Sequence, residues 1–529
     1  MNNEPLDLTA DVLVIGGGPA GTWAALAARR TGATVVLVDK GYCGTSGATA
    51  PSGTGVWYVP PDPGARTAAK SSREALGGYL ADHGWMDRVL DQTWENMHLL
   101  AYDGRYPFPV DPTTGEQIRT GVQGPEYMRR MRAWIARMGV RILDHSPALE
   151  LLVDRDGRVR GASGYGRHDE RDYRVRSGAV VIATGGCAFL SGALGTNVNT
   201  GDGALMAAEV GARLSGMEFS NAYGITAVDS TVTKTAYYGY ATFFHADGRV
   251  LDGAASAAGR SVIARTLLHE PVFAQLDRAD EATQRAMRVG QPNFFLQFDR
   301  RGINPFTDRF EVTLLAEGTV RGTGGLDVVD YTCATTVPGL YAAGDAATRE
   351  RICGGFTGGG SHNAAWAMSS GTWAGAAAGR HARTVGSGGP VSGGGRIGIR
   401  PTGRVALTAT ALTVEAQAQL LPYEINYLRT GSLLRPALRE LEHLWEEASR
   451  GLAGTGRDRI RAREAAAIMA VGRWAYHSAL ARTESRGMSR RADFPSVDPA
   501  QHHHVLSGGL DEVWTATGAR VGEKTAAAS

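Results

Sequence analysis

Three glycines near the start of the chain have the spacing of a phosphate-binding turn. Gly16, Gly18 and Gly21 follow the apolar run 11–15 and precede an alanine-rich segment. In this pattern the first glycine permits a tight turn and the second lets the backbone approach a pyrophosphate, while the third allows close helix–strand packing. Asp39 ends the next apolar run, where a carboxylate can accept ribose hydroxyls. The segment therefore predicts a dinucleotide-binding βαβ unit.

Later segments favour FAD over NAD as the dinucleotide. The run 178–186 (GAVVIATGG) predicts a buried strand that ends in a Thr-Gly-Gly turn, and 200–203 (TGDG) precedes an alanine-rich helix. The run 337–347 (VPGLYAAGDAA) places an aspartate just beyond a strand, and the following glycine-rich segment begins a helix whose amides could face the flavin ring. We expect FAD to be bound by Gly16, Gly18, Pro19, Ala20, Gly21, Asp39, Lys40, Ser46, Gly47, Thr184, Gly185, Asp202, Asp345, Gly360 and Ser361.

The remaining patterns indicate which elements position these residues. Residues 151–165 predict a hairpin that continues into a strand at 173–183, and 233–251 predicts two strands around a turn. Pro271 should interrupt a helix that begins near 259, and 293–300 is expected to be a strand. Long amphipathic helices are expected across 413–462.

Composition excludes several classes of function. The chain has 55 basic and 53 acidic residues, a net charge of +2, which argues against a nucleic-acid partner. No apolar run approaches the roughly 18 residues of a membrane span, and the N-terminus lacks the features of a signal peptide, so we expect no integral membrane segment and a cytoplasmic location. The four cysteines have no CxxC spacing, so we predict no metal site or iron–sulfur cluster on this chain.

The order of motifs resembles the flavoprotein subunits of succinate dehydrogenase and fumarate reductase, with their relatives L-aspartate oxidase and the adenylylsulfate reductase alpha subunit. The matching segments span nearly the whole chain: GGGPAGTWAA, TSGATAPSG, ATGG, NTGDGALMAAEVGARLSGMEF, GRSVIAR, VPGLYAAGDAA and ALARTESRGMSRRADFP.

The resemblance implies an α/β fold, with a Rossmann-like FAD-binding domain, an inserted α+β capping domain and a C-terminal helical domain. The implied boundaries are 1–221 and 319–385 for the FAD-binding domain, 222–318 for the capping domain, 386–403 for a flexible linker and 404–529 for the helical domain.

Departures from the family pattern concern the flavin linkage and the substrate. Where succinate dehydrogenases carry a histidine covalently attached to the flavin, this chain reads Ser46-Gly47-Ala48, so we expect non-covalent FAD. Tyr223 replaces the family's substrate-binding histidine, and the later His-Tyr motif becomes Val320-Arg321. The family's Asn-Arg-Leu-Gly motif, whose arginine holds a substrate carboxylate, falls around Gly355-Phe356-Thr357-Gly358. Three of the four groups that grip a dicarboxylate are missing or displaced. We therefore do not expect succinate or fumarate as the substrate.

The resemblance assigns the catalytic role to Arg260, whose counterpart delivers a proton to carbon as flavin N5 delivers hydride. Arginine is an unusual acid because its pKa exceeds about 12, and Ser261 replaces the aspartate that follows it in the family. The alternative is a salt-bridged surface residue. Candidate substrate contacts are Tyr223, Arg321, His362 and Arg486, and Arg486 has the alternative role of an interdomain anchor.

The sequence predicts an FAD-dependent dehydrogenase or reductase that transfers a hydride between flavin N5 and a C–C or C–N bond of a small polar or anionic substrate. One alternative is a flavoprotein subunit that exchanges electrons with a separate ferredoxin-like iron–sulfur protein, as in adenylylsulfate reductase. Another is a desaturase like 3-ketosteroid dehydrogenase, which would need Tyr223 and Tyr238 beside an apolar pocket. A flavin-binding protein without enzymatic activity is the remaining class.

Overall fold

The computed structural model describes residues 4–256, 258–357, 360–403 and 407–520. Its largest element is an eight-stranded sheet in the order β16-β6-β7-β8-β1-β2-β5, with β15 also paired to β8. The part built from β5, β2, β1, β8 and β15 is parallel, whereas β6, β7 and β16 add antiparallel strands. The strands are β1 (Leu6–Ile15), β2 (Val35–Val38), β5 (Arg141–Leu143), β6 (Ala148–Val153), β7 (Val159–Gly166), β8 (Arg171–Ile182), β15 (Leu340–Ala342) and β16 (Ser392–Gly393).

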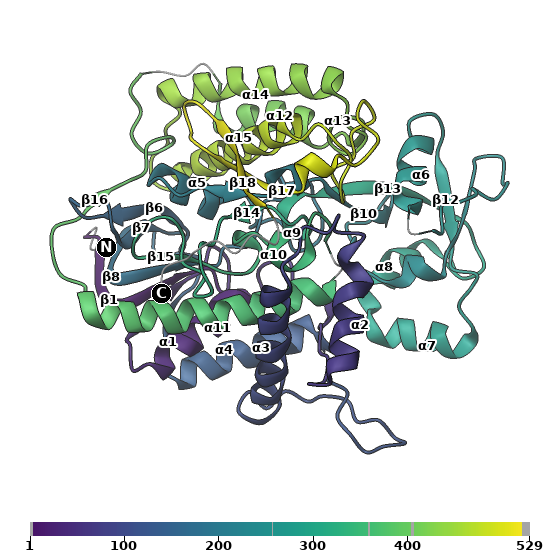
Figure 1. Ribbon diagram of the computed structural model, residues 1–529, viewed down its shortest axis with the longest axis horizontal. Coiled ribbons are helices and arrows are strands. Elements are labelled where there is room, and N and C mark those ends of the chain that lie inside the picture. Colours follow the sequence, from purple (N-terminus) through teal and green to yellow (C-terminus); the bar gives the residue numbers. More distant parts are fainter. Residues whose placement is uncertain (1–3, 257, 358–359, 404–406, 521–529) are drawn as a thin grey trace.

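Two helices from opposite ends of this region pack closely against each other beside the sheet (Figure 1). Helix α1 (Pro19–Arg30) follows the glycine turn, and α11 (Gly360–Val385) lies along it. Gly371, Gly375 and Gly379 are spaced four residues apart on α11, and a Cβ added there would collide with Ala20, Ala24 and Thr31 of the α1 segment. Glycine therefore permits the two backbones to approach closely. The surrounding elements are β3 (Gly53–Gly55), α2 (Pro63–Glu74), α3 (His83–Tyr102), β4 (Gly121–Gln123) and α4 (Gly124–Arg137).

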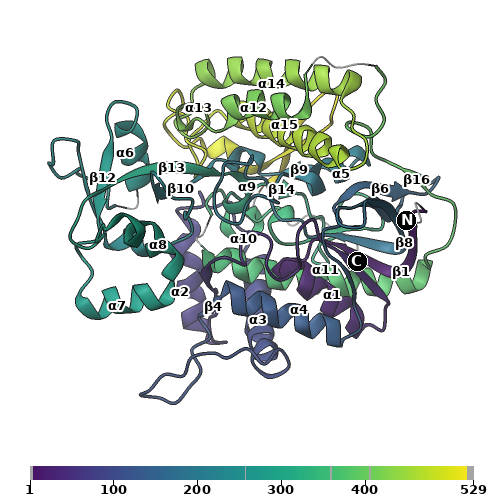
Figure 2. The same cartoon turned by 180° about the vertical axis from the view of Figure 1, so that it is seen from behind.

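The capping region has a sheet and a core of its own. Its antiparallel sheet has the order β10-β13-β12-β11, and Phe294, Phe295 and Phe298 are buried in its core. Figures 1 and 2 show this region to one side of the main sheet. The elements of this region are β10 (Ala222–Ala227), η2 (Tyr237–Tyr240), β11 (Thr242–Phe244), α6 (Gly259–Thr266), β12 (Val272–Gln275), α7 (Glu281–Gly290), α8 (Pro292–Arg301) and β13 (Phe310–Glu317).

Two expectations within this region require correction. Residues 293–300 form helix α8 rather than a strand, because Pro292 occupies the first turn, where it favours a helix, and Gly302 ends it in the left-handed conformation. The segment 233–251 contains the 3-10 turn η2 and only one short strand, β11; Phe244 and Val250 form an isolated bridge instead of a full hairpin. The helix that begins at Gly259 ends at Thr266, five residues before Pro271, and β12 begins directly after the proline.

The C-terminal region combines long helices with a small sheet. Helices α12, α14 and α15 lie above the main sheet in both views (Figures 1 and 2), and β17 and β18 extend a second sheet in the order β14-β9-β17-β18. This region is therefore not wholly helical. Its elements are α12 (Ala409–Leu420), α13 (Tyr423–Asn426), α14 (Gly431–Gly451), α15 (Asp458–Ala481), η4 (Pro499–Gln501), β17 (His503–Gly508) and β18 (Trp514–Arg520).

The segment 386–403, expected to be a flexible linker, is attached to the main sheet. Ser392 and Gly393 pair with β6 as strand β16, and Arg400 forms an ion pair with Glu150 at 2.6 Å. Among the helices that the structure describes, none is long and apolar enough to cross a membrane. The remaining elements are α5 (Asp202–Glu209), β9 (Leu214–Ser215), η1 (Met217–Phe219), α9 (Gly318–Arg321), β14 (Gly325–Leu326), η3 (Gly344–Ala346) and α10 (Glu350–Cys353).

Candidate functional site

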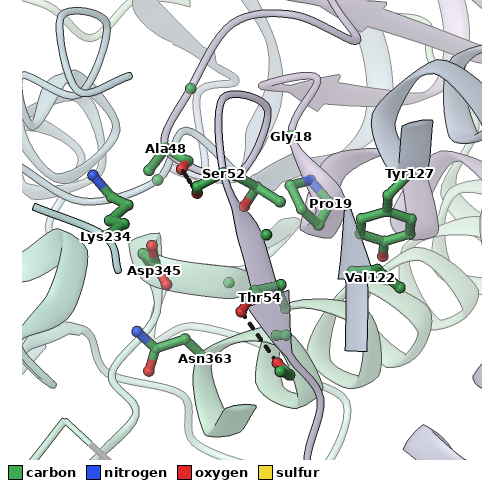
Figure 3. A pocket seen from close by; sticks show the side chains of 18 of the residues that line it. Gly18, Pro19, Ala48, Ser52, Thr54, Val122, Tyr127, Lys234, Asp345 and Asn363 are labelled. Carbon is green, nitrogen blue, oxygen red and sulfur yellow. Dashed lines mark hydrogen bonds between the residues drawn. The ribbon is translucent and has the colours of Figure 1, made fainter. Parts of the chain in front are cut away.

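A cavity of about 850 Å³ lies where the main sheet, α1, α11 and the capping region meet. Its volume is in the range of sites for large cofactors. Figure 3 shows Lys234 and Asp345 on one side and Val122 and Tyr127 on the other. The predicted FAD residues that line it are Gly16, Gly18, Pro19, Ala20, Asp39, Ser46, Gly47, Thr184, Gly185, Asp345 and Ser361.

The three glycines of the turn have distinct surroundings. Gly16 has a φ of +108°, which disfavours any other residue. A Cβ on Gly18 would meet no protein atom within 4 Å, so this backbone is open to the cavity, whereas a Cβ on Gly21 would collide with the carbonyl of Gly16. Gly21 therefore permits packing and does not line the cavity. Helix α1 begins beside Gly18 without a side-chain cap, which leaves its first amides available to an anion.

Asp39 is held rigidly at the end of β2. Its carboxylate accepts hydrogen bonds from the amides of Gly17 at 2.5 Å and Gly41 at 2.7 Å, and from the hydroxyl of Ser46 at 2.8 Å. Only 6 % of Asp39 is exposed, and it lines the cavity. A carboxylate fixed in this position can accept the ribose hydroxyls of the adenosine half of FAD.

Two asparagines supply polar atoms that the sequence reasoning did not single out. Asn199 and Asn363 line the cavity, and their buried Oδ1 atoms have no hydrogen-bond partner among the residues that the structure describes. Buried polar atoms are normally satisfied, so these atoms fit a polar ligand in the cavity. The open backbone at Gly18, the uncapped start of α1 and these two amide oxygens are all suited to a polar ligand that carries phosphates. The residues of the cavity therefore fit FAD.

Lys40 and Asp202, both predicted to bind FAD, do not line the cavity. The amine of Lys40 lies 2.8 Å from Asp202 and 2.6 Å from Glu464, and it donates a hydrogen bond to the hydroxyl of Thr200 at 2.7 Å. Burial lowers the pKa of Lys40, but the two carboxylates outweigh this effect and raise it. These contacts join β2, α5 and α15. Gly360, another predicted FAD residue, is the first residue of α11.

The end of the cavity next to the capping region carries a buried cluster of charges. Glu317 is 1 % exposed and lies 3.4 Å from the amine of Lys234 and 3.5 Å from the guanidinium of Arg321. Thr233 donates a hydrogen bond to the same carboxylate at 2.8 Å. Burial favours a higher pKa for Glu317, but Arg321 and Lys234 lower it. Lys234 and Arg321 both line the cavity.

Lys234 is the main functional candidate that the sequence reasoning missed. Its amine donates a hydrogen bond to the carbonyl of Leu194 at 3.0 Å. Burial lowers the pKa of Lys234; Glu317 opposes this shift and Arg321 adds to it. The only local signal was the rarity of lysine in a chain whose basic residues are nearly all arginine.

A second cavity of about 40 Å³ contains Arg260 and Tyr223, together with Glu317 and Arg321. Among the described residues Arg260 forms no ion pair or side-chain hydrogen bond, and its Nε is buried without a partner. Burial and then Arg321 lower the pKa of Arg260. Tyr223 donates a hydrogen bond to the carbonyl of Leu421 at 3.0 Å. Arg321 therefore lines both cavities, whereas Arg260 lines only the smaller one.

The two remaining predicted substrate residues line neither cavity. His362 is buried and stacks on Trp57 with ring centroids 4.2 Å apart. Arg486 lies 2.6 Å from Glu484 and donates a hydrogen bond to the carbonyl of Gly78 at 2.7 Å. Arg486 therefore joins the C-terminal region to the segment that follows α2, and its role as a substrate contact stays a prediction.

Comparison with protein families divides the chain into two matched regions. The FAD binding domain family matches residues 11–364, and the fumarate reductase flavoprotein C-terminal family matches residues 418–517. An L-aspartate oxidase of Streptomyces coelicolor is 27 % identical over 64 % of this chain and 63 % of its own length. An L-aspartate oxidase of Mycobacterium bovis is 26 % identical over 95 % of this chain and 96 % of its own length.

Solved structures share the fold over nearly the whole chain. The E. coli quinol fumarate reductase FrdA has a TM-score of 0.82 with 21 % identity, and the match covers 99 % of both chains. Adenylylsulfate reductase from Archaeoglobus fulgidus has a TM-score of 0.77 with 18 % identity, and the match covers 98 % of this chain and 97 % of the other.

Proposed function

This chain belongs to the succinate dehydrogenase/fumarate reductase family of FAD-dependent oxidoreductases, and we propose that it transfers a hydride between FAD and a small anionic substrate. FAD supplies the two-electron chemistry when it is bound. The residues of the chain bind the substrate, orient it and handle the accompanying proton. The substrate lies at the end of the large cavity where the capping region meets the main sheet.

The surplus of positive charge at this end carries the proposal. Lys234 and Arg321 are both ion-paired with the buried carboxylate of Glu317. Arg260 lines the smaller cavity beside this carboxylate without forming an ion pair among the described residues. Asp345 adds no free negative charge, because it is ion-paired with Arg349. Buried charges are normally paired, so the cluster favours a ligand that brings negative charge. Arg321 lines both cavities and can clamp a carboxylate or a sulfur oxyanion with its fork of donors.

We assign Arg260 to the same anion-binding group. Its guanidinium has no protein partner in the described residues and lies beside Arg321 and Glu317 in the smaller cavity. An anionic group that reached this cavity would supply the missing partner. Tyr223 contributes to the wall of this cavity, and its hydroxyl is already bonded to Leu421.

The lining of the large cavity supports non-covalent binding of FAD. Its residues include neither histidine nor cysteine among those that the structure describes. Ser46 and Gly47, which occupy the position of the covalent linkage in succinate dehydrogenases, lie in the wall. Acid precipitation of the purified protein should therefore release all of the flavin into the supernatant.

An electron-transferring subunit remains the second candidate function. The likeness to adenylylsulfate reductase over almost the whole chain favours it, as does the Ser-Gly-Ala loop at 46–48. In that case a ferredoxin-like iron–sulfur protein would form a complex with this chain and would be required for turnover.

Anaerobic bleaching of the FAD absorbance tests the proposed function. The panel contains amino acids, hydroxy acids, other small carboxylates, sulfur oxyanions and steroids, each assayed as a reductant, and oxidised acceptors are assayed with the dithionite-reduced protein. We expect an anionic compound to react and the Arg321→Met protein to need a concentration at least ten times higher for half-saturation. Reaction with a neutral steroid alone, or with no compound, would overturn the proposal.

A further inference from the structure

The positions of three cations decide which of them can handle a proton at the substrate. Lys234 and Arg321 line the large cavity, whereas Arg260 lines only the smaller one. In Figure 3, Lys234 lies beside Asp345 on the side of the cavity opposite Tyr127. Arg260 is therefore placed less favourably than Lys234 to meet an atom that reacts in the large cavity.

Lysine and arginine differ in their ability to exchange a proton. An arginine stays protonated at any ordinary pH, because its pKa exceeds about 12, whereas a buried lysine can become a neutral amine. The cations that line the large cavity are Arg73, Lys234 and Arg321. Lys234 is the one lysine among these three, so it is the suitable proton carrier, and Arg321, which is ion-paired with the same Glu317, is the suitable clamp.

We propose that the amine of Lys234 carries the proton that leaves or joins the substrate during hydride transfer, an inference that rests on the proposed function. In the oxidative direction, the neutral amine takes H⁺ from an N–H, O–H or C–H group of the substrate and becomes an ammonium. The adjacent C–H bond breaks, and its hydrogen passes with the electron pair to oxidised FAD. The substrate thereby loses two hydrogens and two electrons and gains one double bond, and the reductive direction is the reverse.

Glu317 acts as the positioning residue of Lys234. Its carboxylate lies 3.4 Å from the amine and is fixed by Thr233 at 2.8 Å. The carbonyl of Leu194 accepts a further hydrogen bond from the amine at 3.0 Å. These contacts hold the amine in place when it is charged. The charged groups that face Lys234 are Glu317, Arg321 and Asp345. Asp345 is itself paired with Arg349, so Glu317 is the main group that favours the ammonium form against burial.

Trace labelling with acetic anhydride tests the titration of Lys234 without any substrate. The FAD-bound protein is labelled across pH 6 to 11, and the extent at each lysine is measured by mass spectrometry. Lys70, a partly buried lysine that is ion-paired with the half-exposed Asp87 at 2.7 Å, serves as the reference. We expect Lys234 to reach half-maximal labelling at a lower pH than Lys70. An equal or higher pH, or no labelling of Lys234 at any pH, would overturn the proposal.

Three variants then distinguish proton transfer by Lys234 from the effect of its positive charge. With the compound that bleaches wild-type FAD as the probe, Lys234→Met should slow bleaching by about 10²- to 10⁴-fold and remove the pH dependence of the rate. Lys234→Arg keeps the charge and should bind the probe normally, yet stay comparably slow. Lys70→Met is the control, and the FAD content of each protein reports folding.

The possible results distinguish the two proposals. Wild-type rates in Lys234→Arg or in Lys234→Met would overturn the role of Lys234 and leave the proposed function intact. If no compound reacts with the wild type, the proposed function fails, and the proton-transfer role that depends on it fails with it. The labelling result would in that case still establish whether Lys234 titrates as a neutral amine.

Discussion

Lys40 and Lys234 are both largely buried, yet their surroundings differ in charge. Lys40 has two carboxylates within 2.8 Å and a threonine hydroxyl, whereas Lys234 has one carboxylate at 3.4 Å and a backbone carbonyl. Their pKa values consequently shift in opposite directions, upward for Lys40 and downward for Lys234. The ratio of carboxylates to cations around a buried amine thus decides whether it is a fixed ion or a titratable group. Lys40 joins parts of the fold, and Lys234 faces the cavity.

The largest expected effect on stability is that of Lys40→Met. This change leaves Asp202 and Glu464 close together without a cation, and breaking a buried ion pair from one side costs about 3–5 kcal/mol. Urea unfolding should show a loss of stability near the lower end of that range, since the side chains of Lys40, Asp202 and Glu464 remain partly exposed to solvent. Lys234→Met should change stability by less than about 1 kcal/mol, because it removes a cation from a cluster with surplus positive charge. Equal losses in the two variants would contradict the comparison.

Glu317→Gln should make the Lys234 cluster still more positive. Removing this carboxylate takes the ion-pair partner from both Lys234 and Arg321, and we expect a loss of about 2–4 kcal/mol in the free energy of unfolding. The pH of half-maximal acetylation of Lys234 should fall further, because Glu317 favours its ammonium form. Glu464→Gln is the matched change at Lys40. It should lower the pKa of Lys40 while leaving the labelling of Lys234 unchanged.

The two lysines should give opposite dependences of stability on pH. The pKa of Lys40 is raised above its usual 10.5, so its contribution is fully present below that pH and is lost as pH rises through the folded-state value. The pKa of Lys234 lies below 10.5, so its ammonium destabilises the fold, and this cost is relieved as pH rises from the folded-state value towards 10.5. Urea midpoints of the wild type and both methionine variants from pH 7 to 11 provide the test. If the urea midpoints of the two methionine variants changed with pH in the same way relative to the wild type, the surroundings of the two lysines would not differ in the way proposed.

Smaller losses than those of Lys40→Met and Glu317→Gln are expected from changes to the threonines that support each cluster. Thr200→Val removes a hydrogen bond to Lys40, and Thr233→Val removes one to Glu317. Each should cost about 1.5–2 kcal/mol, at the lower end of the range for a hydrogen bond to a charged group. Only Thr233→Val should alter the acetylation of Lys234. A shift in Thr200→Val would indicate that the clusters are coupled.

The cofactor half of the site could be predicted because its signals are local. Gly16, Gly18 and Asp39 belong to one βαβ unit, and the physical reason for each residue type is contained in that unit. Lys234 could not be found this way, since its hydrogen-bond partner Leu194 is 40 residues distant and Glu317 is at the end of another strand. Helix α8 was missed because its aromatic residues have high strand propensity, and Pro292 with Gly302 outweighed that propensity.

The close contact between α1 and α11 has a consequence for how this protein tolerates substitution. Alanine is ordinarily the mildest replacement in a helix, and it is the best helix former. At Gly371, Gly375 and Gly379 the added methyl group would collide with Ala20, Ala24 or Thr31, so alanine scanning would report these positions as intolerant although no side chain is removed. Glycine is required at these positions by the short distance between the two helix backbones, and not by any chemical group.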